Sequence, residues 1–180
     1  MRLSLGVVLL AIISLSACSY KVPRDLPIAD PALSQKIKAN QTVAETISTQ
    51  SSLSVFYSLL KSAQLIETLQ GSGPYTVFAP VDNSFLIWPL GALDSLKSAQ
   101  KKADASQFVT SYIVSGRLTL EDMKEGLVLK TLQGRKVTVV YKKSAWYLQD
   151  EKGSLSLIVD GGMSTANGSV FIIDTLLYTK

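Results

Sequence analysis

The stretch TVFAPVDNSF at residues 76–85 decides the fold of this 180-residue chain. Its apolar beginning favours a buried β-strand. Pro80 is expected to stop that strand, because proline has no backbone N–H to donate to a sheet. Asp82 or Asn83 then supplies a side-chain oxygen that caps a following helical turn, and this turn contains Phe85. The stretch therefore predicts a strand, a break, a helix cap and an aromatic anchor.

A second stretch, NGSVFIIDTL at residues 167–176, predicts a tight turn that leads into a core strand. Asn-Gly is a strong signal for a type I′ turn, and the four apolar residues after Ser169 favour a buried strand. Asp174 follows them and is expected to hold a turn or a backbone amide. We expect both stretches to determine the fold rather than to contact a ligand.

Helical patterns come before and just after the first stretch. Residues 42–45, TVAE, match a capping box that opens a short helix. Apolar residues from 53 to 69 follow a helical period, and GSGP at residues 71–74 ends it. A further helix is expected to end near residues 108–109 and to run into Tyr112.

After Gly126 the patterns become mostly those of short strands rich in β-branched residues. They cover residues 127–132, 136–141, 145–149 and 154–159. Helices first and strands later favour an α+β fold over alternating βαβ units.

The two stretches resemble the two conserved motifs of fasciclin-type (FAS1) domains. Between them, IVSGR at residues 113–117 and LKTLQG at 129–134 come in the order that this family shows. The resemblance implies a single FAS1-like domain over residues 40–180. In that fold, N-terminal helices pack on a mostly antiparallel β-sheet or sandwich of short strands. It also implies an adhesion module that contacts proteins or glycans outside the cytoplasm.

Two family features linked to receptor binding are altered in this chain. The positions of a Tyr-His pair hold Ser111 and Tyr112, which are therefore the candidate partner contacts. The positions of an Asp-Ile pair, which animal members use toward integrins, hold Gly162 and Met163. Both departures weaken an integrin-like role.

The N-terminus has the parts of a secretory signal peptide over residues 1–17: a basic start at Arg2 and then a short apolar run. The run ends in Leu15-Ser16-Ala17-Cys18, which resembles the lipobox of bacterial lipoproteins. The resemblance implies cleavage between Ala17 and Cys18 and lipid attachment to Cys18, the single cysteine. An ordinary signal peptide with an incidental cysteine is the alternative. Ser19, rather than Asp, favours the outer membrane by the same resemblance.

Residues 18–39 are expected to form a lipidated N-terminus and a spacer that contains Pro23, Pro27 and Pro31. Proline biases its surroundings toward extended backbone. Such a spacer reaches ~60 Å when fully extended, at ~3.1 Å per residue. It would lift a domain away from the lipid headgroups.

Composition excludes several kinds of chemistry. The chain has no histidine and one cysteine, so Ser-His-Asp or Cys-His catalysis and the usual zinc, haem and copper sites lack their residues. We predict no metal and no cofactor. The net charge of +4 comes without a dense Lys/Arg block, so we expect no nucleic-acid partner. Fourteen acidic residues leave a two-carboxylate hydrolase open, but no pair stands out and we predict no enzyme.

The predicted function is a lipid-anchored binding or adhesion module of the bacterial cell envelope. Its partners are the membrane, through the lipid on Cys18, and an unidentified protein or polysaccharide. The alternative is a passive structural subunit of an envelope complex with no ligand of its own. An exposed apolar patch would favour that alternative.

Overall fold

The computed structural model of the chain describes residues 40–178. No helix within that range is long and apolar enough to cross a membrane. The predicted signal peptide, the cleavage site at Ala17, the lipid on Cys18 and the proline-containing spacer lie outside the described residues and stay predictions.

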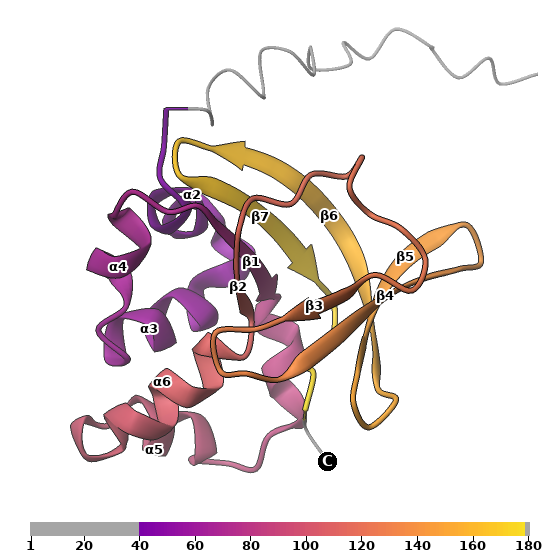
Figure 1. The fold of residues 1–180 in the computed structure, drawn as a ribbon. Coiled ribbons are helices and arrows are strands. Elements are labelled where there is room, and N and C mark those ends of the chain that lie inside the picture. The colour runs from indigo at the N-terminus through magenta and orange to yellow at the C-terminus, as the bar shows by residue number, and fades with distance from the viewer. Residues whose placement is uncertain (1–39, 179–180) are drawn as a thin grey trace, which may run out of the picture.

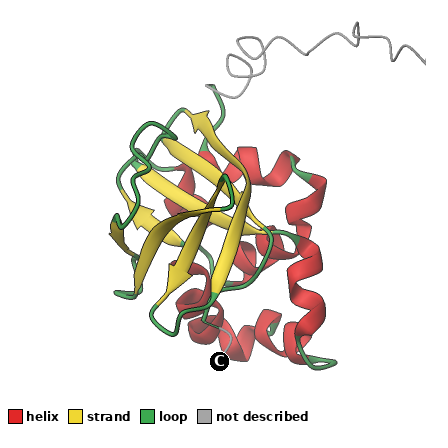
Figure 2. Ribbon diagram, turned by 90° about the vertical axis from the view of Figure 1, so that its right-hand side faces the viewer, coloured by secondary structure: helices red, strands yellow, loops and turns green. Residues whose placement is uncertain are grey.

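The described chain forms one layer of helices on one side of a strongly curved sheet (Figures 1 and 2). The core lies between α2 (Val43–Thr49), α3 (Ser54–Ser62), α6 (Lys102–Thr110) and the central strands. The predicted α+β fold, with N-terminal helices on a mostly antiparallel sheet, is confirmed.

The predicted capping box starts α2. The Thr42 hydroxyl accepts from the Glu45 N–H at 3.3 Å, and the Glu45 carboxylate accepts from the Thr42 N–H at 2.7 Å. The long helical pattern that follows is divided in the structure into η1 (Ser51–Leu53), α3 and α4 (Ile66–Gln70). The break comes at Gln64, whose φ of 57° is incompatible with a continuing right-handed helix.

The second group of helices is η2 (Asp82–Ile87), α5 (Ala92–Lys97), η3 (Ala99–Lys101) and α6. The prediction that Asp82 or Asn83 caps its own turn is wrong, because η2 has no side-chain cap. Instead, the Asp82 carboxylate accepts from the Ser54 hydroxyl at 2.6 Å and the Val55 N–H at 2.8 Å. Asp82 therefore satisfies one free N–H group, that of Val55, at the start of α3, a helix earlier in the chain.

Seven strands form the sheet, in the order β2-β1-β7-β6-β5-β4-β3. Their bounds are β1 (Tyr75–Pro80), β2 (Ile113–Ser115), β3 (Val128–Lys130), β4 (Lys136–Lys142), β5 (Ala145–Asp150), β6 (Leu155–Thr165) and β7 (Gly168–Ile173). Among these strands of the described chain, only β1 and β7 pair in parallel. A bridge between Val114 and Thr131, with a 2.7 Å hydrogen bond from Leu132 N to Ile113 O, joins the two edges. The sheet is therefore nearly a closed barrel.

Two strand ends differ from the prediction. Pro80 is the last residue of β1 and pairs with Ile173 instead of lying outside the strand. β6 continues through Asp160-Gly161-Gly162, beyond the strand predicted over residues 154–159, with irregular register there. A Cβ on Gly161 would lie 2.4 Å from the Phe171 ring, so the close approach of β6 to β7 requires glycine.

The two stretches that predicted the fold lie side by side as β1 and β7 (Figure 1). Phe78 pairs in register with Phe171, and their rings pack 5.3 Å apart. A Cβ on Gly168 would lie 1.9 Å from the Tyr75 carbonyl oxygen, so the pairing starts at a position that only glycine can occupy. The role of both stretches in determining the fold is thereby explained.

Asn167 does not form the type I′ turn that the sequence predicts. Neither Asn167 nor Gly168 has a positive φ. The buried Asn167 amide instead accepts from Val43 N at 2.8 Å and donates to Leu69 O at 2.8 Å and Gly71 O at 2.6 Å. Its side chain fastens the start of α2 and the end of α4 to the sheet. Asp174 accepts from Leu157 N at 2.8 Å, as expected.

Candidate functional site

A surface pocket of about 380 Å³ lies where α6, η2 and the C-terminal segment meet. Its lining comes from segments far apart in the sequence. The residues are Trp88, Asp104, Gln107, Phe108, Ser111, Tyr112, Arg135, Leu177 and Tyr178. We call this cavity the aromatic pocket.

One wall of the aromatic pocket is a cluster of rings. Trp88 meets Phe108 edge-on, with ring centroids 5.2 Å apart, and Phe85 supports Trp88 from behind at 5.4 Å. Phe108 and Tyr112 are one helical turn apart and pack at 5.1 Å. Residues three apart in a 3₁₀ turn and four apart at the end of an α-helix share a face, which explains why these rings converge. Trp88 and Phe108 are half-buried, so part of each faces the cavity.

The opposite wall is the C-terminal segment, which two buried groups hold in place. The Tyr112 hydroxyl donates to Leu177 O and accepts from Leu177 N, both at 3.0 Å. Asp150 accepts from Tyr178 N at 2.8 Å with one oxygen. Its other oxygen accepts from the N–H groups of Lys152 and Ser154. The C-terminal segment is thus fixed at Leu177 by Tyr112, just after α6, and at Tyr178 by Asp150, at the end of β5.

Burial and hydrogen bonding set the ionisation of these groups. Desolvation opposes the charge on Asp150, but backbone N–H donors, that of Tyr178 first, outweigh it and hold the pKa of the carboxyl below its usual value. Burial raises the pKa of Tyr112, and it also raises that of Tyr178. Both phenols therefore remain neutral at physiological pH, and Asp150 remains charged.

Arg135 brings a cation to the mouth of the pocket. Its guanidinium lies over the Tyr178 ring, 4.6 Å from the centroid, and the Tyr178 hydroxyl donates to Lys136 O at 3.1 Å. Within residues 40–178, this guanidinium makes no ion pair and no hydrogen bond. The cation–π contact restricts the position of the guanidinium, and its N–H donors are free to meet an anion.

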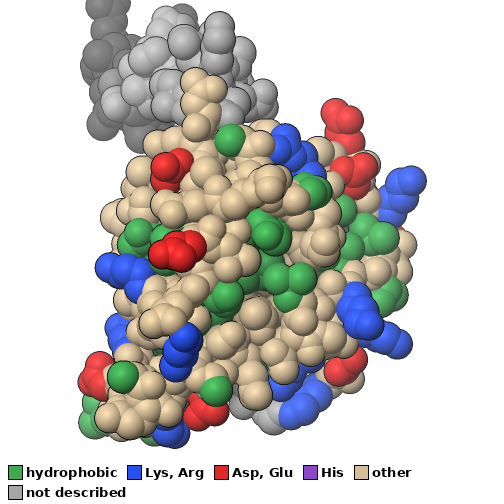
Figure 3. All heavy atoms as spheres, turned by 60° about the vertical axis from the view of Figure 1, so that its left-hand side comes forward, with side chains coloured by type: hydrophobic (Ala, Val, Ile, Leu, Met, Phe, Trp, Pro, Cys, Tyr) green, Lys and Arg blue, Asp and Glu red, His purple; other side chains and the backbone are tan. Residues whose placement is uncertain are grey.

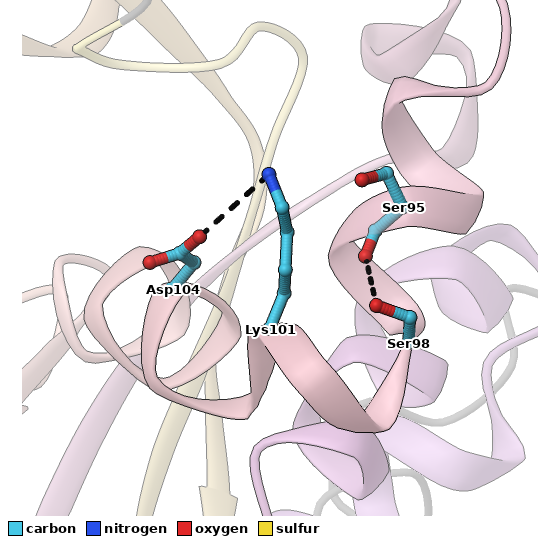
Figure 4. Close-up of polar contacts among 4 residues, drawn as sticks. All are labelled: Ser95, Ser98, Lys101 and Asp104. Atoms are coloured by element: carbon cyan, nitrogen blue, oxygen red, sulfur yellow. Dashed lines mark hydrogen bonds and ion pairs between the residues drawn. The ribbon is translucent and has the colours of Figure 1, made fainter.

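Asp104, on α6, is the carboxylate of the pocket lining. Its nearest cation is Lys101 at 3.8 Å, and both side chains are more than half exposed (Figure 4). Figure 4 also shows how this corner is built, with the Ser98 hydroxyl donating to Ser95 O at 2.7 Å where α5 ends. An exposed pair of this kind contributes little to stability, so Asp104 is available to accept from a ligand.

The sequence prediction named Ser111 and Tyr112 as partner contacts, and the structure places both at the floor of the aromatic pocket. They are 5% and 1% exposed, so neither is part of an open contact surface. Ser111 donates to Gln107 O at 2.9 Å, and Tyr112 holds Leu177. A flat partner surface would therefore not touch them. Whether a ligand reaches them stays a proposal.

The other pocket residues were not predicted. Trp88 directly follows η2, while Arg135 and Tyr178 come from a strand connection and from the C-terminal segment. No spacing rule connects residues so distant in sequence. Pairing of Asp150 with the backbone of Tyr178 was equally invisible, because its partner is a main-chain group.

The pocket has the composition of a binding site. A two-carboxylate hydrolase needs a second acid, and the lining contains a single carboxylate. Residues 40–178 contain no group of three or more side chains suited to hold a metal ion. Figure 3 shows positive and negative side chains interspersed on the face that it presents. The groups that the pocket presents to a ligand are aromatic rings and one guanidinium without a hydrogen-bond partner among the described residues.

A family model of the fasciclin domain matches residues 51–179. The chain belongs to the fasciclin domain family. The solved fasciclin domain pair of the insect cell adhesion molecule fasciclin I has the same fold, with a TM-score of 0.69 and 16% identity. That similarity covers 77% of this chain and 51% of the insect chain.

Curated relatives of this fasciclin chain include bacterial cell-surface proteins. The cell surface glycolipoprotein MPB83 of Mycobacterium bovis is 32% identical over 144 residues, which are 77% of this chain and 61% of MPB83. The immunogenic protein MPT70 of Mycobacterium tuberculosis is 33% identical over 113 residues, 63% of this chain and 53% of MPT70. Protein sll1483 of Synechocystis is 26% identical over 136 residues, 76% of this chain and 72% of sll1483. The chain thus spans less than two thirds of the two mycobacterial proteins.

Proposed function

We propose that this fasciclin protein is an adhesion-type binding module of the cell envelope. A lipid on Cys18 holds it on a membrane, in our proposal the outer membrane, and a spacer over residues 18–39 separates the domain from the lipid. Its ligand is a protein or a polysaccharide. The relationship to MPB83, which is named as a cell surface glycolipoprotein, supports the envelope location.

The aromatic pocket is the observation that supports binding. It combines half-buried rings, a guanidinium with unused donors and an exposed carboxylate in one cavity. Pockets that bind ligands are typically lined by apolar and aromatic side chains with a few placed polar groups. Because the chain has no histidine, the groups present are suited to recognition rather than to acid–base chemistry at neutral pH.

Capture from envelope extracts tests this proposal. The full chain, immobilised in mild detergent, is compared with Trp88→Ala and with a control, Trp146→Ala, which removes a tryptophan stacked on Tyr141 away from the pocket. We expect specific capture by the wild type and the control and its loss in Trp88→Ala, with folding checked by circular dichroism. Equal capture by all three proteins, or no specific capture at all, would contradict the proposal.

One observation favours the alternative of a structural subunit. Leu86, Ile87 and Leu90 are 81%, 64% and 105% exposed, an unusual density of large apolar side chains on one connection. If the chain is a subunit of a complex, Leu86→Asp with Leu90→Asp will reduce its apparent mass on native gels of detergent-solubilised envelopes. An unchanged mass excludes this role for the connection, whatever the pocket binds.

A further inference from the structure

We propose that the aromatic pocket binds a sugar ring that carries a carboxylate, such as a uronic acid unit of an acidic polysaccharide. The proposal rests on the proposed binding function and names the class of its ligand. Three features of the pocket carry it: the guanidinium, the rings and the polar groups between them.

The Arg135 guanidinium selects for an anion with two oxygens. Guanidinium groups meet carboxylates through two parallel N–H···O bonds. The cation–π contact with the Tyr178 ring, 4.6 Å from its centroid, restricts the position of this group before a ligand arrives. Tyr178 is itself fixed through Asp150 and Lys136. Ordering a long, mobile arginine side chain usually costs entropy when a ligand binds. Here the side chain is already ordered, so this cost is smaller.

The rings of Trp88 and Phe108 suit the other part of the ligand. A sugar ring has a face of C–H groups, which packs on aromatic surface, and a rim of hydroxyl groups, which need hydrogen bonds. Both rings are half-buried and meet at 5.2 Å, which makes a rigid apolar wall. A cavity of about 380 Å³ has room for one or two sugar rings rather than for a folded protein segment.

Polar groups in the lining are placed to bind hydroxyls. The Gln107 side chain makes no hydrogen bond within residues 40–178, and the Ser111 oxygen, which donates to Gln107 O, can still accept. Asp104 accepts from hydroxyl groups and repels a carboxylate. The ligand's carboxylate is therefore directed to Arg135, and its hydroxyls to Asp104 and Gln107.

Saturation-transfer NMR on the full chain in mild detergent tests this assignment, with D-glucuronate, D-glucose and N-acetylglutamate as probes. We expect glucuronate to bind, glucose to bind more weakly, and N-acetylglutamate, which has carboxylates but no ring, to give no specific signal. Arg135→Gln should weaken glucuronate binding about tenfold, the value of one charged hydrogen-bonded contact. Lys130→Gln removes the same charge from an exposed position outside the pocket and should leave binding unchanged.

The remaining outcomes overturn the proposal. Equal binding of glucose and glucuronate would show that Arg135 does not recognise the carboxylate. Equal binding of N-acetylglutamate and glucuronate would show that the sugar ring is not recognised. Equal losses in Arg135→Gln and Lys130→Gln would show a general charge effect. Absence of any sugar signal refutes the ligand class, while the envelope capture experiment still decides whether the pocket binds something else.

Discussion

At the scale of single residues, the structure depends on buried or half-buried polar side chains that bond to main-chain groups far away in sequence. Asn167, Asp150, Tyr112 and Asp82 each connect two or more elements in this way. A buried main-chain group that loses its partner costs more than an ordinary hydrogen bond contributes. These four side chains therefore fix the relative positions of helices, sheet and C-terminal segment.

Asn167→Ala should lower the free energy of unfolding by about 2–4 kcal/mol, because it leaves Val43 N and Leu69 O buried without partners. Urea denaturation measures this loss. Asn83→Ala, an exposed change in η2, is the control and should alter stability by less than about 0.5 kcal/mol. Similar values for the two variants would show that the Asn167 amide is not a fastening point.

Asp150 makes stability depend on pH. Its pKa is lower in the folded chain than in the unfolded chain, so its contribution is complete above the unfolded value of about 3.9 and is lost as the pH falls through the folded value. Asp150→Asn should therefore be less stable than wild type at neutral pH, by about 1–3 kcal/mol, and the gap should narrow in acid.

Denaturation curves from about pH 7 to about pH 2 measure that gap. Hydrogen bonds from Thr42 and Thr119 lower the pKa values of Glu45 and Asp122 as well. Both groups titrate alike in wild type and variant, so their contributions cancel in the stability difference. Asp94→Asn, at an exposed position of α5, is the control and should follow the wild-type curve. A gap for Asp150→Asn that stays constant with pH would contradict this account.

At the scale of elements, local patterns predicted most helices and strands, and long-range contacts decided where the patterns failed. The capping box at Thr42 was readable because both of its partners lie within one turn. The break at Gln64 and the extension of β6 beyond Val159 were not, because they depend on how α4 and β7 pack. Asn167 was singled out correctly but for the wrong reason, since its side chain fastens two helices to the sheet and its backbone does not form the predicted type I′ turn.

Gly168→Ala should disrupt the parallel pairing of β1 with β7 and cost about 3 kcal/mol, since the added Cβ would overlap the Tyr75 carbonyl. Gly126→Ala is the matched control. Gly126 has a φ of 80° and open space around its Cβ position, so it should cost only the backbone strain of about 1–2 kcal/mol. Thermal denaturation of both variants separates steric overlap from strain, and a smaller loss for Gly168→Ala would refute the overlap.

At the scale of the whole molecule, the fold was predictable from the sequence, but only a small part of the pocket was. The two stretches at residues 76–85 and 167–176 led to the correct fold because they form neighbouring central strands. Of the pocket, the sequence indicated Ser111 and Tyr112, its buried floor, and missed the exposed Arg135 that gives it chemical character. Surface pockets assembled from separate connections leave no periodic signal in a single sequence.

The lipid anchor is a property of the whole chain, and Cys18→Ser tests it. Without the sulfur that carries the lipid, we expect the protein to leave the membrane fraction and to lose labelling by a fatty-acid analogue. Ser19→Ala keeps the cysteine and should stay membrane-bound and labelled. If Cys18→Ser remains in the membrane fraction to the wild-type extent, the lipid anchor is refuted.

The parallel pair at the centre of the sheet also has a consequence for the order of events during folding. Among the strands of residues 40–178, β1 comes first and β7 last, yet each is the other's neighbour in the sheet. Contacts between distant segments form late, because the chain between them must first be brought together. The central layer cannot close before the final strand is synthesised.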